Sequence, residues 1–243
     1  MSALICWPVA RATFRTRLRS PGPWLVGFLF TVAGAVRGSR HGAGIETFSG
    51  PGTIWFIVLT FALGAAILSD EIESGHAQLV LLRPITRAAW YGGRLAGGCL
   101  AMGLFCVIAW LATFSAAVAR GDGFDPMRFA SLALALVWGC AWLSVLTCLG
   151  AFLPRWTNAG ALGLIILAWI LLFGIVATLR PAWAGVVETV TRFLGPQDPM
   201  IFAEPTKPGR DLGPALYDLV WIFVPWVVGV AILNRRELAR RRA

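Results

Sequence analysis

The chain has 243 residues, of which 58% are hydrophobic and only 14% are charged. This charge content is far below that of a soluble domain, so the composition excludes an ordinary soluble protein and predicts a protein of the lipid bilayer. The formal net charge is +9, but the arginines flank apolar runs and form no continuous basic stripe. We therefore expect the positive charge to meet anionic lipid headgroups and expect no nucleic acid as a partner.

The first predicted element is a short amphipathic helix over residues 8–20. Its apolar face carries side chains at helical spacing, at Trp7, Ala10, Phe14 and Leu18, and arginines line the neighbouring face. Proline suits the first helical turn, and Pro21 ends the helix. We expect this helix to lie on the inner surface of the membrane. The alternative is a basic tail that only sets the topology.

Six apolar runs follow, and we predict that each one crosses the bilayer as a helix. A bilayer core needs roughly 20 apolar residues per helix. The predicted spans are residues 22–38, 53–69, 95–119, 129–153, 159–179 and 216–233, of which the first is the weakest. The last span contains Asp218 near its outer end and Pro225, which should kink the helix. A further helix over residues 182–194 is expected to rest on the outer surface.

The distribution of positive charge predicts the orientation of these spans. If the N-terminus lies inside, 13 of the 21 lysine and arginine residues fall on the inner side and the other eight fall on the outer side. Cytoplasmic segments carry the excess of positive charge in membrane proteins. We therefore expect both termini in the cytoplasm and a multi-pass protein of the cell inner (cytoplasmic) membrane, forming one transmembrane domain over residues 1–243.

The sequence offers no groups for catalysis, cofactor binding or metal binding. Neither His41 nor His76 lies in a predicted span, which excludes haem held between helices by paired histidines. Lys207, the one lysine, lies outside a P-loop motif, so this chain is not expected to bind ATP by that route. The five cysteines form no CxxC pair and are expected to be small buried hydrophobic residues. We expect a non-catalytic protein.

One polar segment, residues 69–95, interrupts the apolar pattern between the second and third predicted spans. It begins with three carboxylates at Asp70, Glu71 and Glu73, then has an apolar run at 79–82, and then Arg83, Pro84 and Arg87. The acids could simply favour a helix start, or the arginines could neutralise them. Neither explanation accounts for four consecutive apolar residues in a cytoplasmic connection. We therefore expect a docking element, followed by a helix that starts near Thr86 and passes Trp90 and Tyr91 at the membrane interface.

This segment resembles the cytoplasmic signature of the permease subunits of ABC exporters of the ABC-2 type. The matching positions are Glu71, Glu73, Gly75, Leu81, Leu82, Pro84, Arg87, Gly93 and Leu95. His76 replaces the usual threonine, and Arg94 replaces the usual lysine with the charge preserved. Six spans, two cytoplasmic ends, a first surface helix and an outer helix before the last span also resemble that family.

The resemblance implies that two permeases pair with two separate ABC ATPase subunits, which bind ATP and Mg. The polar segment would be a coupling helix in a groove of the ATPase, and the small apolar patch framed by charges suits a modest interface. The residues expected to couple to the ATPase are Asp70, Glu71, Glu73, Gly75, His76, Leu81, Leu82, Arg83, Pro84 and Arg87.

The sequence also bears on the cargo and the assembly. The scarcity of charge in the spans favours an amphipathic or apolar substrate. The second permease would be another copy of this chain or a close relative, and Gly93-x-x-x-Gly97 and Ala159-x-x-x-Gly163 would permit close helix contacts. Two rival interpretations are a non-transporting membrane anchor or assembly subunit, and a membrane enzyme.

Overall fold

The computed structural model describes residues 4–41, 51–65, 67–75, 77, 85–121, 127–153, 155–179, 183, 186, 195–196 and 213–235. Each regular element in these ranges is an α-helix, which agrees with the predicted all-helical class. The helices are α1 (Trp7–Arg19), α2 (Pro21–His41), α3 (Pro51–Gly64), α4 (Ser69–Glu73), α6 (Arg87–Ala119), α7 (Met127–Gly150), α8 (Arg155–Leu179) and α10 (Gly213–Arg235). The predicted outer helix over 182–194 and residues 76 and 78–84 of the polar segment fall outside these ranges, apart from single residues.

Four helical stretches in the described part are long and apolar enough to cross a membrane. They are Ile54–Glu73, Arg87–Ala119, Leu132–Gly150 and Leu216–Arg235. Two shorter apolar helices, Pro21–Val36 and Thr157–Ala168, correspond to the first and fifth predicted spans. These long apolar helices agree with a multi-pass membrane protein.

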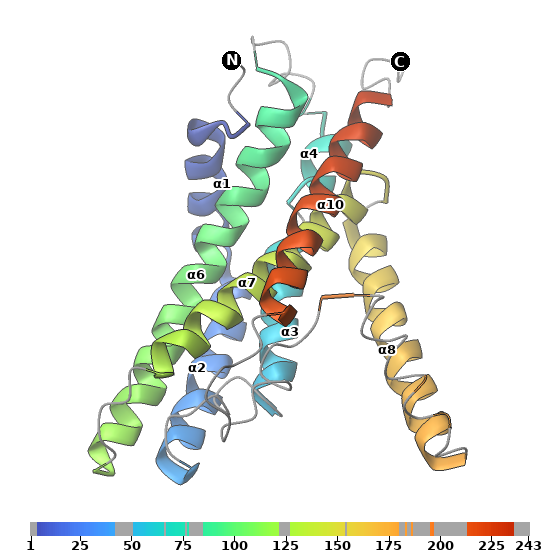
Figure 1. The fold of residues 1–243 in the computed structure, drawn as a ribbon. Helices are drawn as coiled ribbons and strands as arrows, with labels where there is room; N and C mark the ends of the chain where they lie inside the picture. The colour runs from blue at the N-terminus through green and yellow to red at the C-terminus, as the bar shows by residue number, and fades with distance from the viewer. Residues whose placement is uncertain are drawn as a thin grey trace.

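Helices α1 and α2 together follow α6 in the same direction along one side of the bundle (Figure 1). The 33 residues of α6 make a helix about 50 Å long, well beyond a bilayer core of about 30 Å. Two glycines of α6 let α1 approach closely: Gly93 lies beside Cys6 and Gly97 lies beside Ala10 and Thr13. Helix α1 therefore lies lengthwise along the first turns of α6, whereas we expected it to lie flat on the membrane.

The boundary between α1 and α2 is the one that the sequence predicts. Ser20 has an extended backbone with ψ 130, because the residue before a proline avoids the helical region. Pro21 then begins α2. Across this break the indole nitrogen Nε1 of Trp24 donates a hydrogen bond to the carbonyl of Leu18 at 2.6 Å. This bond satisfies a carbonyl at the end of α1 that no helical turn can reach.

The core lies where α3, α6, α7 and α10 meet. Phe56 of α3 stacks on Trp138 of α7, with ring centroids 4.7 Å apart and an interplanar angle of 6°. Trp90 and Tyr91, which we expected at the membrane interface, are fully buried in this core. For Tyr91 the reason is α10, whose Gly229 leaves room for the ring.

Helix α8 leaves the bundle after its first turns and diverges from α3 and α7 (Figure 1). Leu162 near its start is buried, whereas Leu164 is 67% exposed and Leu171 is 55% exposed. A side chain added at Gly160 or Gly163 would meet no atom within 4 Å. Of the two predicted small-residue sites, Gly93-x-x-x-Gly97 is thus filled by α1, and Ala159-x-x-x-Gly163 lies open.

Candidate functional site

The polar segment begins at a break in the second predicted span. We expected an uninterrupted helix over 53–69, but α3 ends at Gly64 and α4 begins at Ser69. In the break, the amide of Ile67 donates to the carbonyl of Gly64 at 3.2 Å, which tightens the chain. The carbonyl of Ala65 accepts from the hydroxyl of Ser69 at 3.1 Å. The turn between the two helices is therefore held by defined hydrogen bonds.

Helix α4 is five residues long and has one buried and one exposed side. Ser69 is buried and Ile72 packs against the core, whereas Glu73 points to the exposed side. Gly75 follows the helix with φ 74, a left-handed conformation that glycine adopts without a steric cost. The glycine of the motif is thus required by the turn that ends α4.

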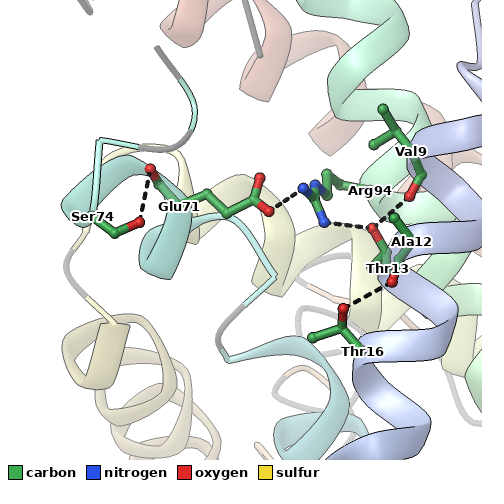
Figure 2. A network of polar contacts seen from close by, with 7 residues as sticks. All are labelled: Val9, Ala12, Thr13, Thr16, Glu71, Ser74 and Arg94. Atoms are coloured by element: carbon green, nitrogen blue, oxygen red, sulfur yellow. Dashed lines mark hydrogen bonds and ion pairs between the residues drawn. The ribbon is translucent and has the colours of Figure 1, made fainter. Parts of the chain in front are cut away.

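Glu71 connects α4 to two other helices through Arg94 (Figure 2). The guanidinium of Arg94 pairs with Oε1 of Glu71 and also donates from Nη1 to the hydroxyl of Thr13 at 2.8 Å. Thr13 in turn donates to the carbonyl of Val9 within α1 at 2.9 Å. The side chains of Arg94 and Glu71 are 11% and 23% exposed. This Glu71–Arg94–Thr13 bridge joins α4, α6 and α1 in a largely water-excluded position, where charged hydrogen bonds are strong.

A second polar contact joins the break to α8. Asn158 is buried, and its Nδ2 donates to the carbonyl of Ala65 at 3.0 Å. Its Oδ1 accepts from the amide of Ala159 at 2.6 Å. The carbonyl of Ala65 therefore receives two side-chain donors, one from α4 and one from α8.

The end of the polar segment is also tied to the bundle. Thr86 caps α6, as predicted, because its hydroxyl accepts from the amide of Ala89 at 3.1 Å. Arg87 donates from Nη1 to the carbonyls of Leu233 at 2.6 Å and Asn234 at 3.1 Å. A cation at these carbonyls stabilises the C-terminal end of α10.

The structure thus places the predicted coupling residues in different surroundings. Glu71 and Arg87 make contacts within the chain, Glu73 is exposed, and Asp70 is half-buried. His76, Leu81, Leu82, Arg83 and Pro84 lie outside the described residues, and the docking of all ten coupling residues stays a prediction. Sequence reasoning missed Thr13 and Asn158, because both lie far along the chain from the polar segment. Arg94 was noted only as a substitution that preserves charge.

One end of the bundle therefore gathers the start of α1, helix α4, the starts of α6 and α8 and the end of α10 (Figure 1). No group of three or more histidine, cysteine or acidic side chains that could hold a metal occurs among the described residues. The arrangement suits mechanical coupling between helices.

Comparison with known protein families gives a match over residues 44–238 to the ABC-2 family transporter protein. The matched region begins after α2 and includes the whole polar segment and α10. No curated protein matches the chain. Since the family match covers most of the chain and agrees with its long apolar helices, the chain belongs to the ABC-2 family of transporter proteins, as a transmembrane permease of the ABC type.

Proposed function

We propose that this chain is the permease subunit of an ATP-driven exporter and that a separate ATPase, which binds ATP and Mg, moves it through α4. The observation that carries the proposal is the position of α4. It follows the apolar helix α3 after a short break, and its Glu71 is linked to α6 through Arg94 and, through Arg94, to Thr13 of α1. Its Ser69 shares the carbonyl of Ala65 with Asn158 of α8. A force applied to α4 would therefore reach several long apolar helices at once.

The proposed topology has six spans and two cytoplasmic ends in the inner membrane. Two features of the packing support it. Helices α3, α6, α7, α8 and α10 alternate in direction along the chain (Figure 1). In addition, the backbone amide of Cys6, just before α1, donates to the carbonyl of Ala89 in α6 at 3.0 Å. The side chain of Arg87 binds the carbonyl of Leu233 at the end of α10. The start of α1 and the end of α10 thus lie beside the polar segment, at the end of the bundle that we place in the cytoplasm.

We assign different roles to the two glutamates of α4. Glu73 is exposed and is the acid that we place at the ATPase surface. Glu71 holds α4 against Arg94 and keeps its orientation when the ATPase pulls or pushes. Replacing Glu73 with Arg should therefore uncouple ATP hydrolysis from transport while the protein stays folded, because it reverses the charge at the docking surface. Transport at the unmutated rate in this variant would remove Glu73 from the mechanism.

A pair of permeases forms the proposed pathway. Helix α8 supports this assembly, because Leu164 and Leu171 are exposed and Gly160 and Gly163 have open space beside them. Small residues let two helices approach closely in a membrane. We place the second copy, or a close relative, against α8. A chain lacking the five native cysteines and carrying Leu164→Cys should cross-link to a second such chain in membranes. If the active complex with its ATPase contains one permease, the paired pathway is wrong.

The proposed cargo is amphipathic or apolar. The described helices of the bundle are lined mainly by apolar side chains, and the ion pair between Glu71 and Arg94 lies at the end of the bundle, not at its middle. A charged inorganic ion would need fixed polar ligands near the middle of the membrane.

Purification and transport assays test the proposal together. The chain should co-purify with an ATPase, and inside-out vesicles containing both should take up the amphipathic dye Hoechst 33342 when Mg-ATP is added. A non-hydrolysable ATP analogue provides the control. Co-purification with an ATPase but no uptake of any amphipathic probe would favour an anchor or assembly subunit. Catalytic activity towards a lipid without any ATPase would favour a membrane enzyme.

A further inference from the structure

Asn158 is a buried polar residue outside the polar segment. It lies in the first turn of α8, 93 residues along the chain from Ala65, and its side chain is 1% exposed. A buried amide needs hydrogen-bond partners, and both ends of this one have them: Nδ2 donates to Ala65 and Oδ1 accepts from Ala159. The orientation of the amide is defined, because a carbonyl can only accept a hydrogen bond.

The acceptor of this bond belongs to the break between α3 and α4. Helix α3 ends at Gly64, and the amide of Ile67 donates a hydrogen bond to the carbonyl of Gly64. Ser69, the first residue of α4, donates to the same Ala65 carbonyl as Asn158 does. A tilt of α4 would therefore move an atom that is bound directly to α8.

The described side chains of α8 differ between its start and the rest of the helix. Asn158 and, one turn beyond it, Leu162 are buried, whereas Leu164, Ile165 and Leu171 are largely exposed. The start of α8 is thus an attachment point to the bundle.

We propose that Asn158 is a positioning residue that transmits the movement of α4 to α8. This inference rests on the proposed function, in which an ATPase moves α4. When α4 tilts, the Ala65 carbonyl carries Asn158 with it, because breaking the bond would take from the buried Nδ2 of Asn158 the acceptor that it has here. The start of α8 follows, and the exposed part of α8 swings. Two residues of α4 thus act on different helices. Glu71 moves α6 and α1 through Arg94, and Ser69 moves α8 through the carbonyl of Ala65 in the break.

Distance measurement between spin labels tests this inference without knowledge of the cargo. One label replaces Ile165 on α8, which lies on another side of the helix from Leu164 and Leu171, and the other replaces Leu111 on α6. Both side chains are exposed, and the chain lacks the native cysteines. The complex with its co-purified ATPase is measured without nucleotide and after trapping with Mg-ATP and vanadate. We expect trapping to shift the distance between the labels.

Two variants remove the link. Asn158→Leu keeps the branched shape and the number of heavy atoms but loses the hydrogen bonds, and Asn158→Ala is the variant to use if the larger Leu prevents folding. Both should reduce the distance shift at least five-fold, while ATP hydrolysis stays within two-fold of the unmutated rate. Asn158→Gln retains a donor and should restore at least half of the shift.

Ser144→Ala provides the matched control. Ser144 is equally buried and donates to a backbone carbonyl of another helix, that of Ile222 in α10 at 2.7 Å, so its bond joins α7 to α10 and does not involve the Ala65 carbonyl. This variant should keep the full distance shift.

The outcomes separate the two proposals. A full distance shift in Asn158→Leu or Asn158→Ala overturns the role of Asn158. An equal loss of the distance shift in Ser144→Ala also overturns that role, because it shows that the loss of any interhelical hydrogen bond has this effect. No distance shift in the unmutated complex, despite ATP hydrolysis, overturns the coupling that the proposed function requires.

Discussion

The ion pair between Glu71 and Arg94 should contribute measurably to stability. The two side chains are 23% and 11% exposed, so the pair is largely shielded from water. Arg94→Gln removes the charge and leaves Glu71 with a desolvated carboxylate, whose Oε2 has no hydrogen-bond partner among the residues that the structure describes. A hydrogen bond to a charged group is worth about 1.5–3 kcal/mol. For a chain of this length, that loss lowers the unfolding temperature by about 3–12 °C.

A double-mutant cycle in detergent, followed by tryptophan fluorescence during heating, measures this contribution. Glu71→Gln and Arg94→Gln should each destabilise the protein. The double variant should cost little more than the worse single variant, because either change alone already breaks the pair. The matched control is Arg11→Gln on the exposed side of α1, which should stay within about 0.5 kcal/mol of the unmutated protein. Additive effects of the two changes would refute the pairing.

Three further predictions concern the local geometry. Gly75→Ala should destabilise the protein by about 1 kcal/mol in thermal unfolding, because alanine resists the φ of 74 that ends α4. Gly97→Ala should loosen α1 and expose it to trypsin, since a methyl group there would lie 2.5 Å from the carbonyl oxygen of Ala10; Gly103→Ala, whose nearest neighbour would be at 3.8 Å, should have no such effect. Arg87→Met should speed hydrogen exchange at the end of α10, and an unchanged exchange rate there would contradict the capping role.

Much of the architecture could be predicted, because membrane spans depend on the local density of apolar residues. Runs of this kind predict helices wherever they occur, and the structure has helices at all six predicted spans. The start of α6 after Thr86 and the end of α1 before Pro21 were also predictable, since capping and proline effects act over three or four residues.

The packing of these helices was less predictable. The burial of Tyr91 depends on Gly229, a small residue far away in α10. The sequence suggests the membrane interface instead, because aromatic side chains gather there. The same limit applies to Gly93-x-x-x-Gly97, whose sequence permits close contact but does not name the partner. The structure supplies α1 as that partner.

The sequence by itself determined that this is a helical membrane protein of the ABC-2 type, because hydropathy and a compact motif are local properties of the chain. Only the tertiary structure decided how the motif is held. The carboxylate of Glu71 needs a cation, and the carbonyl of Ala65, which lies in the break between α3 and α4, needs hydrogen-bond donors. The sequence contains several arginines and polar side chains that could fill either role. Folding selects Arg94 with Thr13 for the first and Ser69 with Asn158 for the second, because the packing of α1, α6 and α8 brings those groups within hydrogen-bonding distance.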